Sequence, residues 1–139
     1  MKRLFLLCAC LFLSPVLSAE IAVVVSANSP APIIQRQDVS NIFLCKTNRF
    51  ASGEKTIPLE INNRSLRDEF YKSITDKTPG QLKSYWTTLI FSGKGKPPKS
   101  FSSKEHLLDY MQDNTGTITY MPLSEVTEAV KVIYLVADD

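Results

Sequence analysis

The sequence predicts an α/β layered fold in a single domain, with a mixed sheet of about four strands flanked by helices. A near-continuous β-branched run at residues 20–26 is typical of a strand that is covered on both faces. Several later segments carry apolar residues at helical spacing, and short apolar runs of strand length precede and follow them. Strands and helices therefore alternate along the chain, which is the pattern of an α/β layered domain.

The first 19 residues are predicted to be a secretory signal peptide. They have a basic start, an apolar run at residues 4–13 that is too short to span a membrane, and a small, polar end. Cleavage after Ala19 leaves residues 20–139, for which we expect one domain in the periplasm with no membrane span. An alternative interpretation makes Cys10 a lipid-anchored residue, but that site would truncate the apolar run.

The first half of the exported chain predicts a short helix and a second strand. The helix is expected within residues 35–46, where apolar residues recur at helical spacing behind Asp38. Residues 56–61 alternate, with isoleucine and leucine on one side and Pro58 and Glu60 on the other. Because proline cannot donate to a sheet ladder, this strand is expected near an edge.

A longer helix is predicted after that strand. Leu66, Phe70 and Ile74 fall four residues apart and would share one face. Ser65 followed by Asp68 resembles a capping box, which favours Ser65 as the residue that caps the helix.

Two more helices and two more strands complete the prediction. One helix is expected over residues 79–91, opening with a proline, and another over 102–114, capped by one of two serines. Strands are expected at residues 115–122 and 129–136. The helix at 79–91 carries a wide apolar stripe: Leu82, Tyr85, Trp86, Leu89 and Ile90.

Residues 92–101, SGKGKPPKSF, are predicted to be a loop that closes this helix. A nucleotide P-loop needs four residues between its first glycine and a Gly-Lys-Ser/Thr triplet. Here Gly93 and Gly95 are one residue apart, and Pro97 and Pro98 remove amides that a phosphate cradle would use. The loop is therefore not a nucleotide site.

Charge and cysteine content exclude two classes of protein. Without Lys2 and Arg3 the chain has 14 basic and 14 acidic residues, which does not support a broadly basic surface for nucleic acid. Cys8 and Cys10 lie in the predicted signal peptide, so Cys45 has no partner for an internal disulfide. We expect Cys45 to be a small buried hydrophobe.

The residues do not predict an enzyme, a metal site or a cofactor. His106 is the only histidine, and without a second histidine or a cysteine pair it is expected to be a solvated surface residue. Asp109 and Asp113 lie one turn apart on the same helix and are expected to be solvated as well. The sequence contains no G-x-S-x-G elbow or comparable nucleophile motif.

Anion binding has a better physical basis. Asn63, Arg64 and Ser65 stand where a strand turns into a helix, and Arg67 follows. Free amides at a helix start, the helix dipole, a hydroxyl and arginine side chains together make an oxyanion site. The alternative is that Ser65 only caps the helix, while both arginines face water.

The end of the first strand supplies secondary candidates for the same cleft. Ser26, Asn28 and Ser29 follow this strand directly. Ligands of α/β sheets bind beyond the carboxyl ends of strands, which is why these residues are candidates.

Three segments carry a family resemblance: residues 37–71, residues 82–101 (LKSYWTTLIFSGKGKPPKSF) and residues 115–121 (TGTITYM). Together, in order and with similar spacing, they resemble the phosphate ABC-transporter substrate-binding proteins, particularly their small single-lobe relatives. The resemblance implies one lobe of a type II periplasmic binding protein, a non-enzymatic role, and phosphate or a similar oxyanion as ligand. It also implies that the glycine-lysine segment is a family loop with a structural role.

The chain departs from this family at the site. Two-lobed members hold phosphate between their lobes, whereas this chain has residues for about one lobe, corresponding best to the second. Their site includes an arginine and a Ser-Gly-Thr turn; here Glu60 stands near the arginine position, and the glycine and threonine are missing. Arg64 and Ser65 would compensate in part. Cys45 and Thr119 stand where the family has glycine.

A second hypothesis belongs to a different class. The chain would be a periplasmic interaction or sensor-partner module that keeps the lobe and has lost the ligand. A missing second lobe would then leave a face for a second copy, in a homodimer, or for another periplasmic protein.

Overall fold

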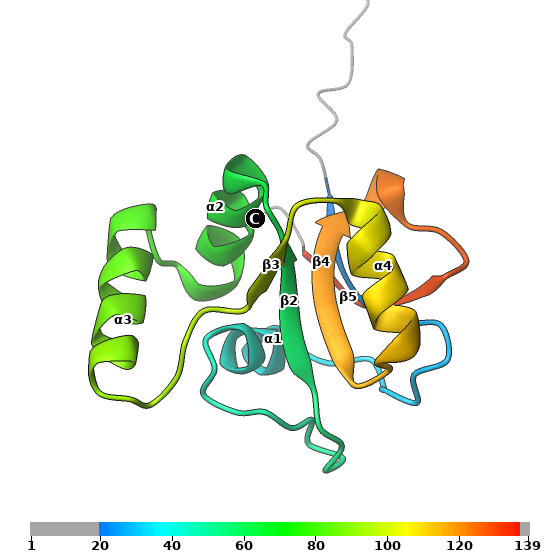
Figure 1. Cartoon of the computed structure of the whole chain (residues 1–139), viewed down its shortest axis with the longest axis horizontal. Helices are drawn as coiled ribbons and strands as arrows, with labels where there is room; N and C mark the ends of the chain where they lie inside the picture. Colours follow the sequence, from blue (N-terminus) through cyan, green and yellow to red (C-terminus); the bar gives the residue numbers. More distant parts are fainter. Residues whose placement is uncertain (1–19, 137–139) are drawn as a thin grey trace, which may run out of the picture.

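A five-stranded mixed sheet with the strand order β3-β2-β4-β1-β5 forms the centre of the fold (Figure 1). The structure is a computed structural model that describes residues 20–136, so the predicted signal peptide lies outside the described residues. None of the helices in this range is long and apolar enough to cross a membrane. The elements are β1 (Ile21–Ser26), α1 (Arg36–Phe43), β2 (Ile57–Ile61), α2 (Arg64–Thr75), α3 (Pro79–Phe91), β3 (Lys99–Phe101), α4 (Lys104–Asp113), β4 (Thr117–Pro122), the 3-10 turn η1 (Leu123–Glu125) and β5 (Val130–Val136).

The predicted fold class is confirmed, with one strand more than expected. β3 lies inside the segment predicted to be a loop, and it pairs in parallel with residues 59–61 of β2. β3 therefore covers one side of β2, except at Pro58, which precedes this pairing. The proline thus stands on an unpaired edge, as a residue without an amide hydrogen requires.

Strand direction decides which loops meet. β3, β2 and β4 run parallel to one another, whereas β1 is antiparallel to both β4 and β5. The carboxyl ends of β2, β3 and β4 therefore lie together at one end of the sheet, and β1 ends at the other.

Helices cover both faces of the sheet, as the first strand predicts. On one face Val23 and Val25 of β1 pack in the main core with side chains of α1 and α2. On the other face Ala22 and Val24 pack in a smaller cluster with Leu108 of α4. β1 is therefore apolar from Ile21 to Val25 because neither of its faces meets water.

The main core is an aromatic cluster. Phe70 of α2 is fully buried and stacks on Tyr120 of β4, with 3.8 Å between ring centroids. Phe43 of α1 meets the ring of Phe70 edge-on at 4.9 Å, and Tyr71 meets it at 5.5 Å. These contacts fix the position of α2, and with it the loop between β2 and α2.

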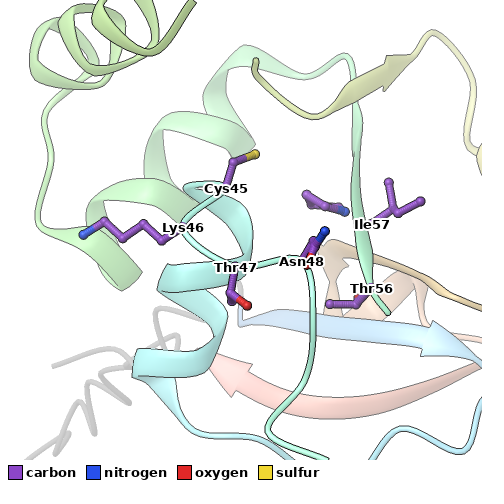
Figure 2. Close-up of a pocket in the computed structure, with 7 residues that line it drawn as sticks. Cys45, Lys46, Thr47, Asn48, Thr56 and Ile57 are labelled. Carbon is purple, nitrogen blue, oxygen red and sulfur yellow. The ribbon is translucent and has the colours of Figure 1, made fainter. Parts of the chain in front are cut away.

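α1 ends with a residue in the left-handed region. Cys45 follows the helix with a φ of 58°, and its thiol donates to the carbonyl oxygen of Lys96 at 3.3 Å. It is half-buried, so the expectation of a fully buried residue is wrong; burial and the nearby Glu60 raise the pKa of its thiol. Cys45 borders a cavity of about 400 Å³ that Thr56 also lines (Figure 2).

Replacing Cys45 by glycine is expected to give a protein about 0.5–1 kcal/mol more stable than the alanine variant. A side chain at positive φ costs about 1–2 kcal/mol, which outweighs the extra backbone entropy of glycine. Both variants lose the same thiol contact, so the comparison isolates the Cβ atom. Urea unfolding measures the difference, and a glycine variant no more stable than the alanine variant would contradict this account.

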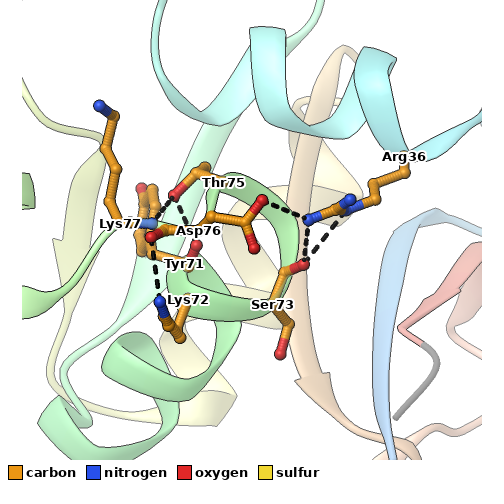
Figure 3. Close-up of polar contacts among 7 residues, drawn as sticks. All are labelled: Arg36, Tyr71, Lys72, Ser73, Thr75, Asp76 and Lys77. Carbon is orange, nitrogen blue, oxygen red and sulfur yellow. Dashed lines mark hydrogen bonds and ion pairs between the residues drawn. The ribbon is translucent and has the colours of Figure 1, made fainter. Parts of the chain in front are cut away.

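The far end of α2 is tied to the start of α1 (Figure 3). The Arg36 guanidinium donates to the carbonyl oxygen of Ser73 at 2.8 and 3.2 Å, and lies 3.3 Å from an Asp76 carboxylate oxygen. It thereby satisfies a carbonyl in the last turn of α2 that has no partner within the helix. Because the pair is exposed, we expect it to orient α2 more than to stabilise it.

Candidate functional site

A polar cavity of about 240 Å³ lies where β2 and β3 end and α2 begins. Its lining residues come from all three elements: Glu60, Ile61, Asn62, Asn63, Arg64, Arg67 and Ser100. Three of the predicted anion-binding residues, Asn63, Arg64 and Arg67, are therefore brought together. Ser65 is exposed on the first turn of α2 and does not line this cavity.

The topology explains why a cavity forms here. The chain leaves β2 through α2 and α3 to reach β3 on one side, then crosses through α4 to β4 on the other side. α2 and α4 pack on opposite faces of the sheet, so they diverge beyond the end of β2. Ligands of α/β proteins bind in crevices of this kind, at the carboxyl ends of strands where the order reverses.

The start of α2 differs from the predicted one. Asn63, and not Ser65, is the N-cap: its side-chain oxygen accepts a hydrogen bond from the amide of Leu66 at 3.1 Å. The prediction of Ser65 as the cap is wrong because Arg64 is already helical, and Asn caps as well as Ser. The amide of Arg67 bonds to the carbonyl of Asn63, which leaves the amides of Arg64 and Ser65 without an intrahelical acceptor.

A buried carboxyl group forms one wall of the cavity. Glu60 is 6% exposed, and one of its oxygens accepts a hydrogen bond of 2.5 Å from the Tyr71 hydroxyl. Burial raises the pKa of Glu60, while the Tyr71 hydrogen bond and the charge of Arg67 lower it by less. Burial also raises the pKa of Tyr71 well above its ordinary value, so this hydroxyl keeps the proton that it donates.

Buried polar atoms next to the cavity lack partners. Arg67 Nε lies 3.8 Å from an Asp68 carboxylate oxygen, which is too far for a hydrogen bond. Among residues 20–136 neither atom has a hydrogen-bond partner, and the same holds for the hydroxyl of Tyr120. Native proteins rarely leave such groups unsatisfied, so these atoms point to water or a ligand between α2 and its surroundings.

The secondary candidates do not belong to this cavity. Ser26 ends β1 beside the start of β4, since Val25 pairs with Ile118, and β2 also starts there. Ser26, Asn28 and Ser29 therefore lie at the opposite end of the sheet, because β1 runs antiparallel to its neighbour. The hydroxyls of the two serines accept hydrogen bonds from backbone amides two residues further on, so they form a local turn.

Two features of the site were not predicted from the sequence. Ser100 belongs to the unpredicted strand β3 and faces the cavity from there. A second, larger groove of about 500 Å³ lies between α2 and α3, and Arg64 and Arg67 line it as well. The apolar stripe of residues 79–91 was the signal for this groove. Within the described residues, no group of three or more histidine, cysteine or acidic side chains is placed to hold a metal ion.

Comparison with known proteins identifies the fold. No family model and no curated protein sequence matches the chain. A solved structure from Clostridium perfringens with bound phosphate, described as a phosphate ABC transporter substrate-binding protein, superposes with a TM-score of 0.61 and 16% identity over 83% of this chain. An ABC-type phosphate transport receptor from Vibrio cholerae gives a TM-score of 0.59 and 15% identity, also over 83% of this chain.

The match covers only part of each of these proteins. This chain corresponds to 45% of the Clostridium perfringens chain and 46% of the Vibrio cholerae chain, so it spans less than half the length of either. This chain has the α/β fold of one lobe of a periplasmic binding protein, and these two structural neighbours are described as proteins of phosphate ABC transport.

Proposed function

We propose that the protein is an exported, non-enzymatic solute-binding lobe that binds phosphate or a similar oxyanion at the start of α2. The observation that carries the proposal is that the free backbone amide of Arg64 at the helix start and the side chains of Arg64 and Arg67 belong to residues that line one cavity. Amides and a helix dipole favour an anion, and guanidinium groups bind its oxygens in pairs. Likeness in fold to proteins described as phosphate-binding supports the choice of anion.

This site binds an anion less favourably than a site lined only by hydrogen-bond donors would. Glu60 is a carboxyl on the cavity wall, and in its charged form it repels an oxyanion. We therefore expect binding of moderate affinity that weakens when Glu60 ionises. Ser65 does not line the cavity, so the proposed site does not include its side chain.

Replacing Arg64 by alanine is expected to weaken phosphate binding by about tenfold to a hundredfold. The side chain lines the cavity, and a charged hydrogen bond contributes about 1.5–3 kcal/mol. Isothermal titration calorimetry with phosphate, sulfate and chloride at constant ionic strength measures affinity and selectivity. Arg49 provides a matched arginine-to-alanine control, because it is exposed, donates to the nearby carbonyl of Gly53 and does not line the cavity.

Two results would separate this proposal from its alternatives. Equal phosphate affinity in the Arg64 variant and the wild type would remove Arg64 from the site. Absence of any heat or thermal stabilisation up to millimolar phosphate would reject oxyanion binding altogether, because a ligand at a hundred times its dissociation constant adds about 2.7 kcal/mol of stability.

A further inference from the structure

The groove between α2 and α3 adjoins the proposed anion site. It has a volume of about 500 Å³, which is in the range of sites that hold small organic ligands. Arg64 and Arg67 line both this groove and the smaller cavity at the start of α2. An anion held by these two side chains would therefore lie at the mouth of the groove.

One wall of the groove is apolar and only partly covered. α3 lies at one side of the molecule (Figure 1), and of its apolar stripe Leu82 alone is fully buried. Ile90 is 55% exposed and Trp86 half-buried, and both face the groove. The Trp86 ring is held edge-on against Tyr71 at 6.4 Å and Tyr85 at 5.1 Å, so its orientation is fixed without a ligand.

The remaining walls carry an excess of positive charge. Arg64, Arg67 and Lys83 line the groove together with a single acid, Asp68. Among the described residues, neither Arg64 nor Lys83 forms an ion pair. Arg67 forms a long one with Asp68 at 3.8 Å, in which its buried Nε atom has no hydrogen-bond acceptor. The groove is therefore complementary to a molecule with a negative group at one end and an apolar body at the other.

Inorganic phosphate would contact only the charged part of this groove. A free phosphate ion can pair with the arginines, but it gains nothing from the exposed face of Trp86 and Ile90. We propose, resting on the anion site proposed above, that the ligand is an organic oxyanion whose charged head binds at Arg64 and Arg67. Its aromatic or aliphatic group lies in the groove against Trp86 and Ile90.

The chain contains a reporter for this proposal. Trp86 is the only tryptophan in the sequence, so its fluorescence reports on the groove without labelling. Phenyl phosphate, methyl phosphate and inorganic phosphate are titrated into the full protein at constant pH and ionic strength, with phenol as the uncharged probe. Calorimetry gives the dissociation constants in parallel with the Trp86 emission.

Phenyl phosphate is expected to bind at least about tenfold more tightly than methyl phosphate and to change the Trp86 emission, because burying a ring adds apolar contact area. Phenol is expected to bind far more weakly than either ester. Replacing Ile90 by serine should remove most of the advantage of phenyl phosphate and leave the affinity for inorganic phosphate unchanged. Phe91→Ser is the matched control, since Phe91 is 91% exposed and does not line the groove.

The outcomes separate this inference from the proposed function. Equal affinities for phenyl phosphate and inorganic phosphate, with no effect of I90S, would overturn the inference and leave the oxyanion site intact. Phenol binding as tightly as phenyl phosphate would overturn it too, because the groove would then act independently of the arginines. If no anion binds, both proposals fail. A dimer that I90S dissociates would show that a second copy fills the groove, and this would also overturn the inference.

Discussion

Replacing Phe70 by alanine is expected to lower the free energy of unfolding by about 3–5 kcal/mol. The side chain has no exposed surface and stacks on Tyr120 at 3.8 Å between centroids, so its removal leaves a cavity that rigid neighbours cannot fill. A domain of this size is stabilised by only about 5–15 kcal/mol, so the variant would lose a large share of its stability. Urea unfolding followed by circular dichroism measures the change.

Phe91 offers a matched control for this substitution. It is also a phenylalanine in a helix, but it is 91% exposed at the end of α3. Its replacement by alanine is expected to change stability by less than about 0.5 kcal/mol, as is usual for surface positions. A loss below about 1 kcal/mol for Phe70→Ala, or similar losses for both variants, would contradict the aromatic core described here.

The buried strand and helix face could be predicted from the sequence most directly. Residues 21–25 are apolar at every position, which indicates a strand between two layers, and β1 has helices on both sides. Leu66, Phe70 and Ile74 recur every fourth residue, and all three are buried. These predictions succeed because burial imposes a periodic pattern that a single sequence displays.

Strand pairing between distant segments could not be predicted in the same way. β3 has only three residues in a segment rich in glycine and proline, and it is a strand because β2 offers a free edge beside it. The direction of β1 relative to β2 also depends on pairing, and it moved Ser26 to the opposite end of the sheet from Arg64. Local pattern gives no information on either point.

Glu60 is buried, although the alternating pattern of apolar and polar residues in β2 is typical of a strand with one face in water. The residue alternates with Leu59 and Ile61 in β2, a pattern that usually places a carboxylate in water. Here Leu59 packs with side chains of α4, while Glu60 meets Tyr71 of α2 on the other face. A buried carboxyl beside an arginine atom without a hydrogen-bond partner marks a candidate functional site, and this signal exists only in three dimensions.

Replacing Glu60 by glutamine is expected to stabilise the protein at neutral pH. Because burial raises the pKa of Glu60, the native state holds its proton more tightly than the unfolded chain does. As the pH rises from the ordinary pKa of glutamate through the raised one, the unfolded chain ionises first, and the free energy of unfolding falls. The loss amounts to about 1.4 kcal/mol for each unit by which the pKa is raised.

Glutamine keeps an oxygen that can accept from the Tyr71 hydroxyl, but it cannot ionise. The variant and the wild type should therefore have similar stability below the ordinary pKa of glutamate. The variant should gain as the pH rises, up to a constant difference above the raised pKa. Urea unfolding across pH 4 to 8 measures this, with the exposed Glu69→Gln on α2 as the control. A difference that does not change with pH would show that Glu60 ionises equally in both states.

The same substitution tests the proposed site independently of stability. Uncharged glutamine on the cavity wall no longer repels an oxyanion, so phosphate affinity at pH 8 is expected to rise on the order of tenfold. At a pH where Glu60 is protonated, the wild type and the variant should bind alike. If the variant binds phosphate more tightly than the wild type at every pH, the cause is a changed cavity shape. If the two bind equally at pH 8, the anion lies away from Glu60. Because Glu60, Arg64 and Arg67 line one cavity, opposite effects of Glu60→Gln and Arg64→Ala on the same calorimetric titration would locate the anion between them.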